Sequence, residues 1–479
     1  MKMRPTVLML VALWTAAPPP SAAQAPPAAS GAGWDSAAYY FLLARHHESA
    51  GEIDRAIEVL KQAISLAPES AELRAELAGI YARQNRAAAA IETAEEALKY
   101  DPQNREANRI IGSIYAAAAD QRRAIRPGES PQLYVARAIA ALERAVQAGP
   151  TELGLDLTLG RLYLLSESYD KAIPLLRRVA SEQPGYADGA ILLASALDGA
   201  GQTSDAIGTL EAMLADNPRS FRGHVMLAEL REKAGDWEQA AQAYARAQSL
   251  NTRSGDLTLR RAAALINAGH GPTARDLLSE LASKPEAQPL VLYLFASAQR
   301  MSGELAGAEA TARRLRQAAP DDPRGMYVLA QVLEARGDVN GAEQSLRDIL
   351  KRDPNDATAL NYLGYMFAER GVRLDEAVEL VQRALKVEPG NAAFLDSLGW
   401  AYFQQGKLDL ADPPLTEAAG KMPKNSVIQD HLGDLRYKQG RFADAAAAWE
   451  RSLAGDGESI DRERILKKIQ DAKSRQEAQ

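Results

Sequence analysis

Large apolar and small residues recur along the chain with a period close to 34 residues. Several prolines stand 34 residues apart and mark this period: Pro68 and Pro102, Pro184 and Pro218, Pro320 and Pro354. Placing the prolines near the end of each unit gives twelve units, which begin at Ala37, Ala71, Arg105, Leu153, Ala187, Phe221, Gly255, Pro289, Pro323, Ala357, Ala392 and Ser426. A period of this length is typical of stacked supersecondary units, and each unit here is predicted to be two helices joined by a short turn.

Two positions within the unit hold small residues throughout. Position 8 is always Ala or Gly: Ala44, Ala78, Gly112, Gly160, Ala194, Ala228, Ala262, Ala296, Ala330, Gly364, Gly399 and Gly433. Position 20 is always Ala: Ala56, Ala90, Ala138, Ala172, Ala206, Ala240, Ala274, Ala308, Ala342, Ala377, Ala411 and Ala445. Because antiparallel helices approach closely only where side chains are small, we expect the two helices of each unit to nest at these positions. Position 7 is large and apolar in eleven units and is expected to fill the space beside them.

The helix ends are also marked. Position 15 is Gly in nine units, and Gly ends a helix by adopting a left-handed backbone. Proline near position 32 ends the second helix, because it cannot continue one. Pro413–Pro414 are the exception, since they fall early in a second helix and are expected to bend or delay it.

The third unit carries 14 extra residues, around 117–132. Residues 116–119 are expected to extend the preceding helix. The rest of the insertion contains Arg122, Arg123 and Arg126, which would suit a basic docking loop. A tolerated surface insertion is the simpler interpretation.

Both ends of the chain differ from the repeats. Residues 1–23 resemble a secretory signal peptide, with basic Lys2 and Arg4, an apolar run over 7–17 and small residues before a cleavage predicted after Ala23. An uncleaved interfacial anchor is the alternative. Residues 24–35 are an Ala, Pro and Gly-rich leader, and we expect an exported protein of the periplasm. Residues 458–479 are predicted to form a capping helix, from an N-cap at Ser459 to about Ala472, followed by a tail.

Composition and charge exclude several classes of function. The 56 basic and 63 acidic side chains give no basic face for nucleic acid or an anionic membrane. There is no cysteine, so neither a thiolate site nor a lipid-anchor cysteine is expected. The five histidines have no metal-ligand spacing, and no phosphate-binding loop or nucleophile elbow occurs. We therefore predict a non-catalytic protein without metal or cofactor.

The repeat resembles the tetratricopeptide repeat (TPR). The segment Leu398-Gly399-Trp400-Ala401-Tyr402, followed by Gly406, Ala411 and Pro423, matches the family motif closely, and Leu363-Gly364-Tyr365-Met366-Phe367 matches it too. The resemblance implies an all-α fold, a right-handed α-solenoid of about twelve TPR helical hairpins over residues 36–457. The C-terminal capping helix would shield the last hairpin.

The resemblance also implies a binding surface, because positions 2, 5, 9 and 12 of the first helices commonly line a concave groove in this family. In the last three units these positions supply the candidate partner-binding residues Asn361, Tyr365, Asp396, Trp400, Phe403, Asp430, Asp434 and Tyr437. Packing between repeats is the alternative role for them. The function predicted is a protein–protein interaction scaffold or adaptor of the cell envelope that holds a protein or peptide partner. A carbohydrate- or lipid-handling component of an export complex is the alternative, since an aromatic such as Trp400 can stack on a sugar.

Overall fold

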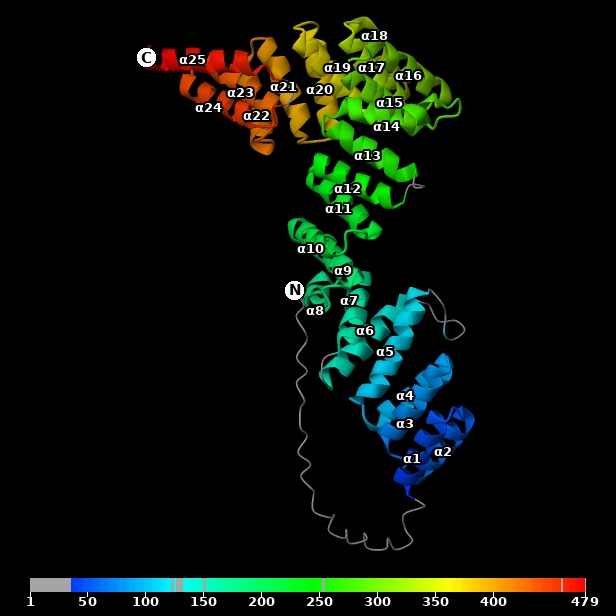
Figure 1. Ribbon diagram of the computed structural model, residues 1–479. Helices are drawn as coiled ribbons and strands as arrows, with labels where there is room; N and C mark the ends of the chain where they lie inside the picture. The colour runs from blue at the N-terminus through cyan, green and yellow to red at the C-terminus, as the bar shows by residue number, and fades with distance from the viewer. Residues whose placement is uncertain are drawn as a thin grey trace, which may run out of the picture. The chain divides into compact units, whose positions relative to one another are not determined.

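The computed structural model describes residues 36–121, 125, 132–149, 152–251, 255–457 and 460–478, and all regular secondary structure within these ranges is helical (Figure 1). The signal peptide, the leader, Ser459 and the insertion arginines lie outside the described residues. The chain divides into two compact units, residues 1–217 and 218–479. Among the described residues, no helix is long and apolar enough to cross a membrane.

The first unit contains ten helices within the described ranges. They are α1 (Ala37–Ser49), α2 (Ile53–Leu66), α3 (Ala71–Arg83), α4 (Ala87–Tyr100), α5 (Arg105–Asp120), α6 (Gln132–Gln147), α7 (Leu153–Leu165), α8 (Tyr169–Glu182), α9 (Ala187–Gly199) and α10 (Thr203–Asp216).

The second unit contains fifteen helices within the described ranges. They are α11 (Phe221–Ala234), α12 (Trp237–Leu250), α13 (Gly255–Asn267), α14 (Gly271–Ser283), α15 (Pro289–Met301), α16 (Leu305–Ala318), α17 (Pro323–Ala335), α18 (Val339–Arg352), α19 (Ala357–Glu369), α20 (Leu374–Val387), α21 (Ala392–Gln404), α22 (Leu408–Lys421), α23 (Ser426–Lys438), α24 (Phe442–Ala454) and α25 (Arg462–Ala478).

The odd-numbered helices α1 to α23 begin at the twelve residues that the sequence marks as unit starts. Each packs with the next even-numbered helix as an antiparallel hairpin, and the predicted all-α fold of stacked hairpins is confirmed. Several first helices are capped by a side chain, as where Ser70 accepts a hydrogen bond from the Leu73 amide and Asn425 from the Ile428 amide. Ser and Asn are preferred at such positions because they satisfy amides that have no partner within the helix.

Small residues hold each hairpin together as predicted. All twelve alanines of position 20 are fully buried, with no exposed surface. The glycines of position 8 lie against the facing helix so closely that a Cβ on Gly364 would stand 2.6 Å from Val381 Cγ2 and 3.0 Å from the carbonyl oxygen of Ala377, the position-20 residue of its own hairpin. In this hairpin the two small positions therefore contact each other, whereas Gly112, Gly160 and Gly399 lie nearest to Leu142, Leu176 and Leu415, each four residues beyond position 20.

The turn within the hairpin keeps one conformation even where glycine is missing. Gly337 and Gly406 have φ values of 82° and 75°, in the left-handed region. Asn85 and Glu167 occupy the same place in the second and fourth hairpins, with φ of 57° and 55°. Because a side chain disfavours this conformation, the packed helices must impose it on these two residues.

The structure differs from the sequence predictions at α22 and at both ends of α25, and agrees with them at the end of α5. Helix α22 begins at Leu408 and continues through Pro413 and Pro414, so the prolines do not delay it, and the burial of Pro414 and Leu415 keeps the helix in place. Helix α5 runs to Asp120, which includes the expected extension. Helix α25 begins at Arg462, later than a cap at Ser459 predicts, and Asp461 Oδ1 accepts a hydrogen bond from the Arg464 amide. It continues to Ala478, beyond the predicted end at Ala472.

Candidate functional site

Helices α19, α21 and α23, the first helices of the last three hairpins, carry all eight predicted binding residues. Between these helices lies a cavity of about 240 Å³, here called the α19–α23 pocket. Its lining is Asn361, Tyr365, Ala393, Asp396, Ser397, Met422, Asn425, Val427 and Ile428. The structure thus brings three of the predicted residues into one cavity: Asn361 and Tyr365 of α19 and Asp396 of α21.

The polar wall of the pocket contains an acceptor without a donor. The side-chain oxygen Oδ1 of Asn361 is buried and makes no hydrogen bond to any described residue. Next to it, burial and the nearby carboxylates of Glu369 and Asp396 raise the pKa of Tyr365, so its hydroxyl stays protonated. An unsatisfied buried acceptor costs about 1–3 kcal/mol. The Asn361 side chain is therefore held in the pocket wall at a cost in stability.

Asp396 is held by a histidine that the sequence analysis did not select. His431 Nδ1 lies 2.9 Å and 3.1 Å from the two carboxylate oxygens of Asp396, and the two residues are 6% and 5% exposed. Burial by itself lowers the pKa of His431, but the negative charge of Asp396, with smaller contributions from Asp430 and Glu369, outweighs burial and raises it above 6.5. The result is a buried ion pair that joins α21 to α23.

Trp400 lies behind the pocket rather than on an open face. It is 8% exposed, and its ring stacks on His431 at 4.0 Å and on Phe403 at 4.9 Å between centroids. Its indole Nε1 donates to Glu369 Oε2 at 3.0 Å. The suggestion that Trp400 stacks on a sugar does not suit this geometry, because the neighbouring rings already cover it. Instead, Trp400 orients Glu369, which lies at position 13 and so escaped a search of positions 2, 5, 9 and 12.

The predicted residues on α23 bind the C-terminal helix of the chain itself. Lys468 Nζ of α25 lies 2.7 Å from Asp430 Oδ1 and 2.6 Å from Asp434 Oδ1, and the Tyr437 hydroxyl donates to Asp471. In this structure these three side chains are thus engaged with α25, and their role in binding a partner stays a prediction. The contact forms because α25 packs on α24 through its own apolar side, so its polar side meets α23.

The contact with α25 leaves a second cavity in the same region. It measures about 510 Å³ and is lined by Trp400, Phe403, Asp434 and Tyr437 together with residues of α24 and α25, among them Trp449, Lys468 and Asp471. Burial raises the pKa of Asp434, although Lys468 opposes the shift. The cavity has mixed charge and shares its walls with the contact between α23 and α25.

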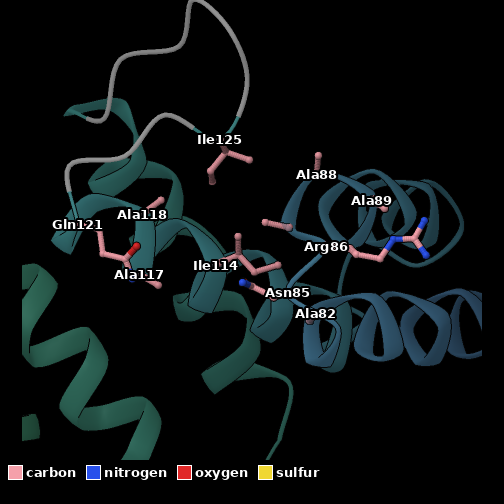
Figure 2. A pocket seen from close by; sticks show the side chains of 11 residues that line it. Ala82, Asn85, Arg86, Ala88, Ala89, Ile114, Ala117, Ala118, Gln121 and Ile125 are labelled. Carbon is pink, nitrogen blue, oxygen red and sulfur yellow. The ribbon is translucent and has the colours of Figure 1, made fainter. Parts of the chain in front are cut away.

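An apolar cavity of about 480 Å³ lies in the first unit (Figure 2). Its walls are the turn after α3, the alanines 87–89 at the start of α4, and Ile114, Ala117 and Ala118 near the end of α5, with Ile125 beside them (Figure 2). The nearby cation Arg86 lies over the ring of Tyr81, at 4.7 Å. The cavity offers mainly apolar surface, with Asn85, Arg86 and Gln121 as its polar lining. No three His, Asp or Glu side chains of the described chain are grouped as a metal site.

Comparison with known families identifies the repeat. Profiles described as tetratricopeptide repeat match residues 48–114, 135–187, 164–230, 224–257, 299–363 and 372–423, which together make up more than half of the chain. The chain belongs to the tetratricopeptide repeat family, as its motifs indicated. Repeats of this family typically form non-catalytic protein–protein interaction scaffolds, and the fold supports that role here.

Individual relatives resemble only part of the chain. TPR repeat-containing protein PA4667 of Pseudomonas aeruginosa is 44% identical over 75 residues, which are 16% of this chain and 12% of the relative. TPR repeat-containing protein MJ1428 of Methanocaldococcus jannaschii is 32% identical over 80 residues, 17% of this chain and 14% of the relative. The matched segments thus span less than a sixth of either relative.

Solved structures with a similar fold include yeast Tom70, at 14% identity and a TM-score of 0.47, covering 92% of this chain and 95% of Tom70. The structure of Naa15/Naa10 bound to HypK-THB gives 16% identity and a TM-score of 0.44, covering 92% of this chain and 73% of the other.

Proposed function

We propose that this protein is an adaptor of the cell envelope that binds a segment of a partner polypeptide at the α19–α23 pocket. The observation that carries the proposal is a cavity shared by three successive first helices, whose wall combines the polar Asn361 and Asn425 with apolar side chains. A polypeptide carries a carbonyl acceptor and an N–H donor at nearly every residue. The amides of Asn361 and Asn425 offer N–H₂ donors for such carbonyls.

The shape of the pocket favours a peptide over a sugar. Its polar atoms lie beside apolar walls formed by Ala393, Val427 and Ile428, which suits alternating backbone and side-chain contacts. Sugar recognition by stacking needs an open aromatic face, and Trp400 does not present one. We therefore prefer a polypeptide partner to a carbohydrate.

Export from the cytoplasm is proposed on the sequence of residues 1–23. The basic residues Lys2 and Arg4, the apolar run and the small residues before Ala23 support secretion and cleavage. Cell fractionation should recover the protein in the periplasm, and N-terminal sequencing should begin at Gln24. Recovery of an uncut chain from the cytoplasm would contradict this part of the proposal.

Site-specific photo-crosslinking tests the binding surface. A benzoylphenylalanine residue at Ala393, which is exposed on the pocket wall, should form adducts with a polypeptide in intact cells. The matched control carries the same group at Glu379, an exposed residue of the second helix α20 outside the pocket. The proposal is supported if adducts form at residue 393 and decrease in the Asn361→Leu variant. Equal adducts at both positions, or adducts that survive complete protease digestion, speak against it.

A further inference from the structure

The cavity of about 510 Å³ lined by residues of α21, α23, α24 and α25 is here called the α21–α25 cavity. Its apolar lining is aromatic and consists of Trp400, Phe403, Tyr437 and Trp449. Trp400 and Trp449 are almost fully buried, whereas Phe403 and Tyr437 are only half-buried. The cavity therefore offers a guest an aromatic wall, which suits another aromatic side chain because rings pack favourably edge to face or offset.

The C-terminal helix forms one wall of this cavity and is held there from two sides. Its Ile465 and Ile469 are buried in one apolar cluster with residues of α24. Its Lys468 Nζ lies 2.7 Å from Asp430 Oδ1 and 2.6 Å from Asp434 Oδ1 of α23. Since α24 and α23 both fix α25, the helix is a built part of the cavity and more than a cover for the last hairpin.

Two cations in the lining have no partner. Lys438 is the last residue of α23, and Arg464 precedes Lys468 by four residues, so it lies on the same side of α25. The side chains of Lys438 and Arg464 are exposed and make no ion pair or hydrogen bond with the described part of the chain. Two walls of the cavity therefore each carry a free positive charge.

The carboxylates of the cavity already have partners, and the balance of charge stays positive. Asp471 Oδ2 lies 3.1 Å from Arg475 Nε, so these two charges compensate each other. Asp430 and Asp434 share the single cation Lys468, which leaves one negative charge. The two unpaired cations outweigh that charge, so a guest with complementary charge is acidic.

We propose that the α21–α25 cavity binds a segment of the partner polypeptide in which an aromatic side chain stands next to aspartate or glutamate. The inference rests on the proposed polypeptide partner and adds a second contact, at a different cavity, together with its chemistry. A volume of about 510 Å³ corresponds to roughly 17 water molecules at about 30 Å³ each, which is room for a large side chain. The aromatic ring packs on the aromatic wall, and the neighbouring carboxylate accepts hydrogen bonds from Lys438 and Arg464.

Defined peptides test the inference with the full chain. Biotinylated nonapeptides with an amidated C-terminus carry phenylalanine at the centre, glutamate on both sides of it and uncharged flanks, so no terminal carboxylate takes part. Matched peptides carry glutamine in place of glutamate, or alanine in place of phenylalanine. Biolayer interferometry should show the first peptide binding at least tenfold more tightly than either matched peptide. The preference for glutamate should shrink in 0.5 M salt, since added salt screens the exposed Lys438 and Arg464.

Single substitutions connect the preference to the cavity. Lys438→Gln and Arg464→Gln should each reduce the preference for glutamate over glutamine by threefold or more. Lys467→Gln removes an exposed cation of α25 that does not line the cavity, and it should leave the preference unchanged. All three side chains are exposed, so the melting temperature of each variant should stay at the wild-type value.

The outcomes separate this inference from the proposed function. Equal binding of the glutamate and glutamine peptides, or an equal effect of Lys467→Gln and Arg464→Gln, would overturn the acidic preference of the cavity. Equal binding of the phenylalanine and alanine peptides would overturn the aromatic contact. Crosslinking at Ala393, which lies outside this cavity, decides the proposed function separately. Adducts at residue 393 without binding of any peptide would therefore overturn this inference alone.

Discussion

Replacing Gly364 with alanine should destabilise the tenth hairpin, although alanine is the better helix former. Gly364 lies in α19 and faces α20, where an added Cβ would stand 2.6 Å from Val381 Cγ2 and 3.0 Å from the Ala377 carbonyl oxygen. Val381 is fully buried and, as a β-branched residue in a helix, has essentially one rotamer. Neither neighbour can move aside, so the two helices must separate.

The size of the effect follows from two opposing contributions. Overpacking of a close contact costs about 1–3 kcal/mol. Alanine gains about 1 kcal/mol over glycine inside a helix. The net loss is then about 0–2 kcal/mol. Gly420→Ala in α22 isolates the second contribution, because Gly420 is an exposed helical glycine whose Cβ would meet nothing within 4 Å. That control should stabilise by up to about 1 kcal/mol.

Hydrogen exchange followed by mass spectrometry is the suitable assay, because long repeat arrays need not unfold in one step. Peptides from α19 and α20 should exchange faster in Gly364→Ala, and peptides from α22 should exchange no faster in Gly420→Ala. A chemical denaturation series would give the accompanying difference in unfolding free energy, expected at about 1–3 kcal/mol between the two variants. If Gly364→Ala proved as stable as Gly420→Ala, close approach at position 8 would not be what holds the hairpin.

Three further substitutions test the electrostatics and packing of the second unit. The ion pair of His431 and Asp396 stabilises the fold fully below about pH 6.5, and this stabilisation is lost as the pH rises through the raised pKa of folded His431. The melting temperature of wild type should therefore exceed that of His431→Gln by less at pH 9 than at pH 6. A constant difference would contradict the ion pair. Trp400→Ala should cost about 3–5 kcal/mol in chemical denaturation, since it empties a buried site, and a loss near zero would show that the ring is exposed in solution. The hydrogen bond from Arg373 lowers the pKa of Glu343 from 4.5 to about 2. As the pH falls from 4.5 to 2, wild type should therefore lose stability relative to Glu343→Gln, measured by circular dichroism. If the two proteins lose stability in parallel, the ion pair contributes nothing.

The hairpins could be predicted from the sequence because the interaction that builds them is local and repeats. The two helices of one unit pack together across a single turn, and the small residues at positions 8 and 20 leave a strong pattern in the sequence. Gly364, for example, lies close to Val381 and to the Ala377 carbonyl of its own hairpin. The same locality explains why the start of each of the twelve hairpins was placed correctly, while the continuation of α22 through Pro413 was missed. There, burial of side chains overrides an intrinsic preference of the backbone.

The contacts around the α19–α23 pocket were harder to predict, because they form between hairpins. The pairing of Asp396 with His431 joins residues 35 positions apart, and neither residue type signals it alone. Glu369 could have been found, since a buried Trp400 indole needs an acceptor and a carboxylate one turn beyond the predicted positions is available. The binding of Lys468 to Asp430 and Asp434 could not have been found from the repeat pattern, because α25 lies outside it.

The left-handed turn at Glu167 bears on how such an array can be rebuilt. Since Glu167 holds the same backbone as the glycines of other hairpins, the geometry of each joint is independent of the residue that forms it. Whole hairpins should then be exchangeable between places in the chain as cassettes, provided that the small residues of their inner contact travel with them. Replacing Glu167 with glycine should stabilise this turn by about 1 kcal/mol, and it is a simple first substitution for protein engineering.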